Sequence, residues 1–269
     1  MKRVNNQKQK AKSINVFRIV LMVLFGLLMT ETGTFAMLTI KANHDHIKID
    51  FFYHGSTVSV RGEADQGTDL VIKIASSEGS QLLRKKGRVA GLLWMNIGNL
   101  SYEHVPSLYF LHSTKNLAEI LSSDERDKYS LGYPALNRHI EIRPVESEEE
   151  KSKWFNEFVK VKESSKVYDT SSGKIAISER KGRQNYYILL DWPYQALQGN
   201  YTATVYAVKD KKVVETAESN VLVEQVGFVK TMFNMAMNNG ALYGIISILV
   251  AISAGFAVGL IFRQGGGAH

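Results

Sequence analysis

The chain has 269 residues, of which 45% are hydrophobic and 22% charged, with four prolines and no cysteine. This composition excludes global disorder, and the lack of cysteine excludes disulfides, iron–sulfur clusters and thiol chemistry. The net charge of +7 does not predict nucleic-acid binding, because much of it belongs to the first 36 residues, where Glu31 is the only acid.

The N-terminus has a basic region followed by the apolar stretch Ile19–Met29. That stretch is too short to span a bilayer and a polar segment follows it at once, so residues 1–36 are predicted to be a signal peptide cut after Ala36. A cut after Ala42 and an uncleaved membrane anchor are the alternatives.

The exported region, residues 43–225, has alternating apolar and polar residues, which is typical of strands. Residues 115–165 are predicted to form a helical insertion, in which Ser147–Lys162 opens with a capping box of Ser147 and Glu150. We therefore expect a mainly β fold: an immunoglobulin-like antiparallel sandwich with a helical insertion. The predicted strands are Ile47–Phe51, Thr57–Arg61, Leu70–Ile74, Val89–Met95, Leu108–Leu111, Tyr186–Leu190, Tyr201–Val208 and Val213–Val223.

The C-terminal region is predicted to attach the domain to a membrane. Leu242–Phe262 carries no charge and is long enough to cross the bilayer, so residues 241–263 are expected to be a transmembrane helix. Arg263 places the tail, 264–269, in the cytoplasm, and the main domain on the outer (periplasmic) side of a bacterial cytoplasmic membrane. Residues 226–240 are amphipathic and predict a helix in the membrane interface; a helix packed on the domain is the alternative.

Small residues recur along the predicted transmembrane helix at close to helical spacing. They would let a second helix, from a multi-span permease or from another copy of this chain, approach closely. Membrane helices are also rich in small residues without such a role. The residues of this row are Gly244, Ser247, Ala251, Gly255 and Gly259.

Several segments occur in a recognisable order: Asp69–Ile72, Arg84–Asn96, Val105–Tyr109, Gly199–Tyr201 and Tyr243–Arg263. Together they resemble a known family, that of putative transmembrane proteins described mainly from alphaproteobacteria. The resemblance covers most of residues 47–263. It implies a signal peptide, an exported region and a final membrane helix, and an accessory role beside a permease of the sulfite/taurine exporter type. It implies no catalytic residue. Leu92 and Leu93 depart from the family, in which a β-branched residue and less bulk are commoner before Trp94.

Two clusters are candidate sites. His44 and His46, with His54 nearby, could hold copper or zinc together with an aspartate, although two histidines without a third ligand are common by chance. A basic run could bind lipid phosphates, sulfonates or an acidic partner, or could be a charged hairpin tip that protects a sheet edge. The run consists of Arg84, Lys85, Lys86 and Arg88.

Enzyme signatures such as G-x-S-x-G, H-E-x-x-H and G-x-G-x-x-G do not occur in the sequence. We therefore expect no enzyme and no cofactor. The sequence predicts a single-pass membrane protein that acts as a non-enzymatic accessory or interaction subunit of a transporter. The alternative is a membrane-anchored extracytoplasmic module that binds a solute or a metal.

Overall fold

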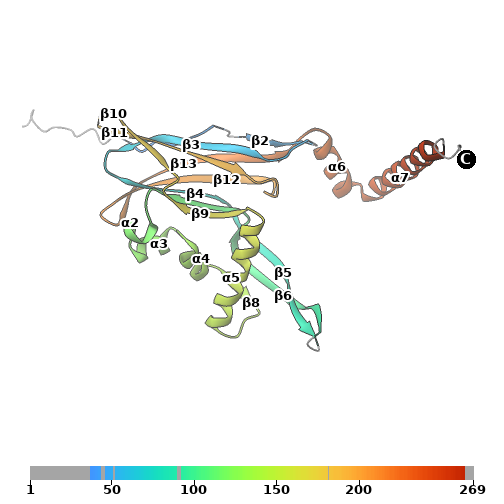
Figure 1. Cartoon of the computed structure of the whole chain (residues 1–269), viewed down its shortest axis with the longest axis horizontal. Coiled ribbons are helices and arrows are strands. Elements are labelled where there is room, and N and C mark those ends of the chain that lie inside the picture. The colour runs from blue at the N-terminus through green and yellow to red at the C-terminus, as the bar shows by residue number, and fades with distance from the viewer. Residues whose placement is uncertain (1–36, 44–45, 51, 90–91, 181, 264–269) are drawn as a thin grey trace, which may run out of the picture. The chain divides into compact units, whose positions relative to one another are not determined.

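A computed structural model describes residues 37–43, 46–50, 52–89, 92–180 and 182–263. Strands, arranged in three sheets, are the most common secondary structure among these residues, and Figure 1 shows how the sheets and helices are arranged. The predicted signal peptide, His44 and the tail 264–269 lie outside the described residues. The prediction of a mainly β chain with helices in its middle and one C-terminal apolar helix is confirmed.

One layer of the fold is a four-stranded antiparallel sheet. Residues alternate between its two faces: in the central strand every second side chain, from Tyr186 to Trp192, is buried and the intervening ones point outward. In order across the sheet, the strands are β1 (Lys41–Ala42), β3 (Ser56–Asp65), β11 (Arg183–Trp192) and β10 (Ala176–Arg180).

A six-stranded sheet packs against this layer, and the facing side chains of both sheets form one hydrophobic cluster. The pairs β2–β13 and β7–β9 at its two edges are parallel, so this sheet is mixed and not purely antiparallel as expected. The immunoglobulin-like character stays a prediction. The strands, in order, are β2 (His46–Ile49), β13 (Lys212–Gln225), β12 (Gly199–Lys209), β4 (Asp69–Ser76), β7 (Tyr109–Ser113) and β9 (Tyr168–Ser172).

The other face of the six-stranded sheet is covered as well, which explains why β4 is apolar on both sides. Leu70 and Ile72 face the first cluster, while Val71 belongs to a second cluster shared with the helical insertion. Figure 1 shows the insertion on this side of the sheet. Its helices are α2 (Leu117–Ile120), α3 (Ser123–Lys128), α4 (Tyr133–His139) and α5 (Glu148–Ser164).

Helix α5 begins as predicted. The Ser147 side chain accepts a hydrogen bond from the Glu150 backbone N–H at 3.1 Å, and Phe155, Phe158 and Val159 are buried on one face. The Glu150 carboxylate accepts from the backbone N–H of Glu146, one residue earlier than in a standard capping box.

The folded domain begins before the predicted boundary at residue 43. Leu38 and Ala42 are buried in the first cluster, and the chain crosses Gly62 so closely that a Cβ there would overlap the Thr39 carbonyl oxygen. The Tyr186 hydroxyl donates to the same carbonyl. A cut after Ala42 would remove Leu38 and Ala42 from the core, so these contacts disfavour that alternative, while the signal peptide 1–36 stays a prediction.

The third sheet consists of a long hairpin, β5 (Glu78–Val89) and β6 (Leu93–Pro106), joined at its base by β8 (Glu141–Arg143). We call residues 78–106 the arm. β5 ends at Val89 and β6 begins at Leu93, so the segment that was predicted to be the single strand Val89–Met95 is divided between two strands. That prediction was wrong because the apolar residues on both sides of Ala90-Gly91 form the ends of two strands.

Two helices follow β13 at the C-terminus: α6 (Gly227–Asn238) and α7 (Gly240–Arg263). In α6 none of the residues is buried. Within the described part of the chain, α7 is the one helix long and apolar enough to cross a membrane, over Gly240–Leu260, and none of that window is buried by the rest of the chain.

Candidate functional site

The base of the arm is fixed to α5 by aromatic packing and hydrogen bonds. The rings of Tyr102 and Phe158 stack with their centroids 4.6 Å apart, and the Tyr102 hydroxyl donates to the Trp154 carbonyl at 3.1 Å. The Lys162 ammonium donates to Gln81 at 2.5 Å. These contacts make the inner half of the arm part of the domain.

The predicted basic run lies on β5 and is divided between the two faces of the arm. Lys85 points toward α5, where its ammonium lies 3.6 Å from the Glu150 carboxylate and 4.5 Å from the centre of the Trp154 ring. Arg84, Lys86 and Arg88 are exposed, on the opposite face because side chains alternate along a strand. The structure therefore brings three of the four predicted residues onto one surface and gives Lys85 a structural role.

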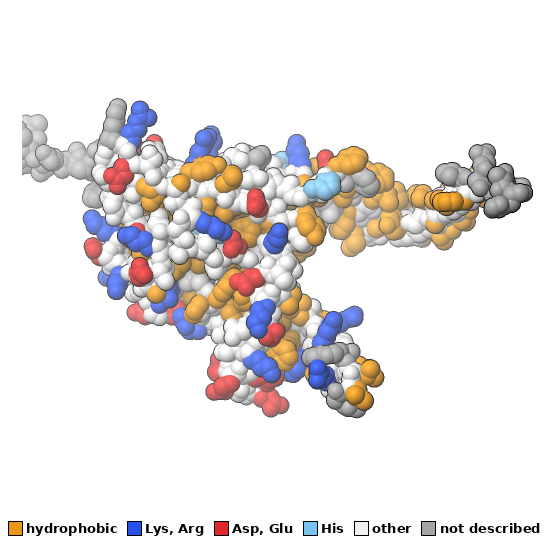
Figure 2. All heavy atoms as spheres, in the orientation of Figure 1, with side chains coloured by type: hydrophobic (Ala, Val, Ile, Leu, Met, Phe, Trp, Pro, Cys, Tyr) orange, Lys and Arg blue, Asp and Glu red, His pale blue; other side chains and the backbone are white. Residues whose placement is uncertain are grey.

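Large apolar side chains gather at the outer end of the arm. Leu92 is 85% exposed and Leu93 66%, and Met95 and Ile97 are about half exposed. Figure 2 shows basic and apolar side chains side by side there. None of the 24 residues from 79 to 102 is acidic, so the arm carries net positive charge. The sequence drew attention to the basic residues but did not show that these apolar ones would be exposed.

The predicted helix-packing residues all lie on α7. At 100° per residue Gly244, Ala251, Gly255 and Gly259 fall on one face, and nothing lies within 4 Å of the place a Cβ would take at the three glycines. Ser247 also belongs to this face, but its hydroxyl donates to the Tyr243 carbonyl of the same helix at 2.8 Å. The face is therefore smooth and has no polar group that needs a partner.

The histidines do not form a metal centre within the described residues, where no group of three or more histidine and acidic side chains could hold a metal ion. His46 lies on β2 with its Nε2 2.8 Å from the Glu224 carboxylate, and the His54 ring contacts the Phe52 carbonyl two residues away. Because His44 lies outside the described residues, the predicted His44/His46 site stays a prediction.

His112, which the sequence did not single out, is fully buried on β7. Its Nδ1 lies 2.7 Å from the Ser171 hydroxyl, while Nε2 is buried without a hydrogen-bond partner among the described residues. Burial, together with the nearby Lys174 ammonium, lowers the pKa of His112 to about 4, although the Asp169 carboxylate acts in the opposite sense. The side chain is therefore neutral at physiological pH.

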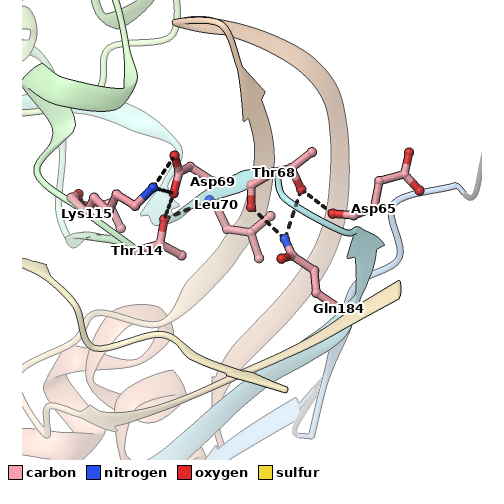
Figure 3. Close-up of polar contacts among 8 residues, drawn as sticks. Asp65, Thr68, Asp69, Leu70, Thr114, Lys115 and Gln184 are labelled. Atoms are coloured by element: carbon pink, nitrogen blue, oxygen red, sulfur yellow. Dashed lines mark hydrogen bonds and ion pairs between the residues drawn. The ribbon is translucent and has the colours of Figure 1, made fainter. Parts of the chain in front are cut away.

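A polar cluster at one end of the sandwich joins the two sheets (Figure 3). The buried Gln184 amide on β11 donates to the Thr68 carbonyl at 2.7 Å and to the Thr68 hydroxyl at 3.0 Å. Beside it, the Asp69 carboxylate accepts from Thr114 and from Lys115. Because these groups satisfy one another, the cluster has a structural role and offers no open ligand site.

A pocket of about 580 Å³ beside β9, β11 and the end of α5 combines charges of both signs. Asp169 and Lys174 form an ion pair of 3.0 Å in its wall. Lys166, Glu163 and Asp191 also line it, so a small zwitterionic solute would meet both kinds of charge.

A family model described as "Putative transmembrane protein (Alph_Pro_TM)" matches residues 37–264. The chain belongs to this family. The match confirms the resemblance seen in the sequence and, together with the apolar helix α7, makes this a membrane-anchored protein. The alphaproteobacterial origin, the orientation and the identity of the membrane stay predictions. No curated protein matches the chain.

Proposed function

We propose that this member of the Alph_Pro_TM family is a non-enzymatic accessory subunit of a membrane transporter. In this proposal α7 crosses the bacterial cytoplasmic membrane once, the β domain is held on the periplasmic side, and the C-terminus is cytoplasmic. A permease of the sulfite/taurine exporter type is the first candidate partner, because the family resemblance implies it.

The proposal rests on the uncharged, unburied surface of α7. Its 24 residues carry no charge before Arg263, and no part of its apolar window is covered by the domain. One face of the helix is lined by glycines with open space above them. In lipid, such a face gains dispersion contacts when another helix packs on it, which lipid chains supply less well.

The experiment is a pull-down of the tagged full-length protein from native membranes in mild detergent, followed by mass spectrometry. Gly255→Leu places a bulky side chain in the middle of the small-residue face and should remove a helix partner. Ala257→Leu is the matched control, because residue 257 lies on the opposite side of the helix.

The proposal is supported if a multi-span permease is recovered in near-stoichiometric amount with the wild type and Ala257→Leu, and lost with Gly255→Leu. Recovery of the protein without any membrane partner contradicts it. A homodimer that Gly255→Leu disrupts would instead make this face a site of self-association.

The orientation can be tested independently because the chain has no cysteine. A single cysteine introduced at Ser178, on the exposed strand β10, should react with a membrane-impermeant maleimide in intact spheroplasts. Reaction only after permeabilisation would place the domain in the cytoplasm and exclude the proposed topology.

The second candidate function, a solute-binding module, is favoured by the pocket beside β9 and β11. If taurine or sulfite binds there, it should raise the unfolding temperature of the purified protein, and Lys166→Ala should abolish that rise. Lys160→Ala, an exposed change on α5 outside the pocket lining, is the control. If the domain instead binds a metal through His46, the purified protein should retain stoichiometric copper in equilibrium dialysis. His46→Ala should then abolish copper binding.

A further inference from the structure

We propose that the tip of the arm, formed by Lys86–Arg88 and Leu92–Ile97, is a second membrane contact that inserts the exposed side chains of Leu92, Leu93 and Met95 into an anionic lipid surface. This inference depends on α7 being a membrane anchor and does not depend on a transporter partner. Its occupant is the leaflet of the same membrane that faces the domain.

The tip has the two kinds of side chain that a lipid surface selects. Leu92, Leu93 and Met95 are more than half exposed and have no apolar cover from the domain. Arg84 and Lys86 are exposed on the strand that leads to them, and in the described part of the chain neither makes an ion pair. Apolar side chains that enter the interface, with basic ones beside them at the phosphates, are typical of surface-bound membrane segments.

The alternative role for the basic residues, protection of a sheet edge, explains only part of this surface. β5 is an edge strand of its sheet, and exposed Arg84 and Lys86 suit an edge that must not pair with another chain. Edge protection does not require Leu92 and Leu93 at the end of the hairpin, because exposed apolar residues there favour association. The apolar tip therefore needs its own explanation.

The shape of the tip favours lipid over a protein partner. Beyond Lys85, which is held on α5, only two strands and their turn remain. A few side chains on so narrow a structure cannot supply the roughly 800 Å² per partner of a stable protein interface. They are enough to wedge into a headgroup layer, where each apolar side chain gains on leaving water without requiring a complementary surface.

The membrane is within reach of the arm. β5 has 12 residues and is therefore about 40 Å long. The domain is joined to α7 through α6, whose 12 residues span about 18 Å. Because this tether is short, the whole domain stays near the bilayer, where the high local concentration of lipid favours even weak insertion of the tip.

The absence of native cysteines allows a direct test in the full-length protein. Leu93→Cys carries an environment-sensitive fluorophore, and the protein is placed in nanodiscs of phosphatidylcholine alone or with one third phosphatidylglycerol. Doxyl-labelled lipid quenches a fluorophore in the bilayer, and iodide quenches one in water. Ser178→Cys, on the exposed strand β10, is the control position.

We expect quenching by doxyl lipid at residue 93 in the anionic discs and not at residue 178. Arg84→Ser with Lys86→Ser should lower the ratio of inserted to free tip roughly 30-fold, because each basic side chain near an anionic surface contributes about a factor of five. Lys209→Ser with Lys212→Ser, two exposed changes at the β12–β13 turn, should leave the ratio unchanged.

Three results would overturn the proposal. The first is iodide quenching at residue 93 in both kinds of disc. The second is doxyl quenching that is equal with and without phosphatidylglycerol. The third comes from a photoreactive benzophenone on the same cysteine in native membranes: crosslinks to a polypeptide in place of lipid would make the tip a protein-docking site.

Discussion

Buried His112 should make the domain sensitive to acid. Its imidazole has no exposed surface and one nitrogen without a hydrogen-bond partner among the described residues, and burial lowers its pKa to about 4 from an ordinary value of 6.5. Between those two values the unfolded chain binds a proton that the folded chain does not. Above pH 6.5 the titration of His112 therefore causes almost no loss of stability. The free energy of unfolding then decreases as the pH drops from 6.5 toward 4.

The size of the effect follows from those two pKa values. At pH 5 the unfolded histidine is almost fully protonated and the folded one is mostly neutral, so His112 alone should lower the free energy of unfolding by about 2 kcal/mol relative to pH 7.5. His112→Phe keeps a ring beside Phe110, whose centroid lies 6.3 Å from that of His112, and removes the titrating group. The His112→Phe variant should therefore not show this loss of about 2 kcal/mol in the free energy of unfolding between pH 7.5 and pH 5.

The assay is urea unfolding of the full-length protein in detergent at pH 7.5 and pH 5.0, followed by tryptophan fluorescence, to which the buried Trp192 contributes. The quantity of interest is the pH-dependent loss in the wild type minus that in His112→Phe, because carboxylates contribute equally to both. His139→Gln, which removes an exposed histidine, is the control and should behave as the wild type. An equal loss of stability in the wild type and His112→Phe would refute this reasoning.

Three further substitutions test the packing of the domain, each by its urea midpoint. Gly62→Ala should lower the free energy of unfolding by about 2–3 kcal/mol, because the chain that crosses it must shift and expose Leu38; Gly79→Ala, which has open space around its Cβ, should stay within about 0.5 kcal/mol. Phe158→Ala should lower the free energy by about 3–5 kcal/mol and expose the arm to protease, because it removes the ring that holds the arm on α5. Ser147→Ala should lower it by about 1 kcal/mol through loss of the helix cap.

Features that depend on neighbours in sequence could be predicted. The strands β12 and β13, the cap at Ser147 and the apolar helix α7 are each set by residues within a few positions of one another, and all are confirmed. The short helices α3 and α4 could not be predicted, because six or seven residues carry too little periodicity and depend on tertiary packing.

Features that depend on distant residues could not be derived from the sequence. Gln184 bonds to Thr68 across 116 positions of chain, and nothing near either residue indicates the other. The same holds for the arm: the sequence showed the basic run, but its division between two faces depends on the register of β5 with β6 and on α5. Because this register is not visible in the sequence, Leu92 and Leu93 were assigned to a buried strand, whereas their side chains are exposed.

The strand that leads to the membrane has a mechanical role. The last four residues of β13 pair in parallel with β2, and Leu222 and Val223 pair with β12 as well. The next residue, Val226, donates to the Ile49 carbonyl at 2.9 Å. A pull transmitted from the bilayer must therefore break ladder bonds on both flanks before β13 can peel from the sheet. Because the short strand β2 holds the end of β13 in the sheet, tension from the membrane should extend α6 before it unfolds the sandwich.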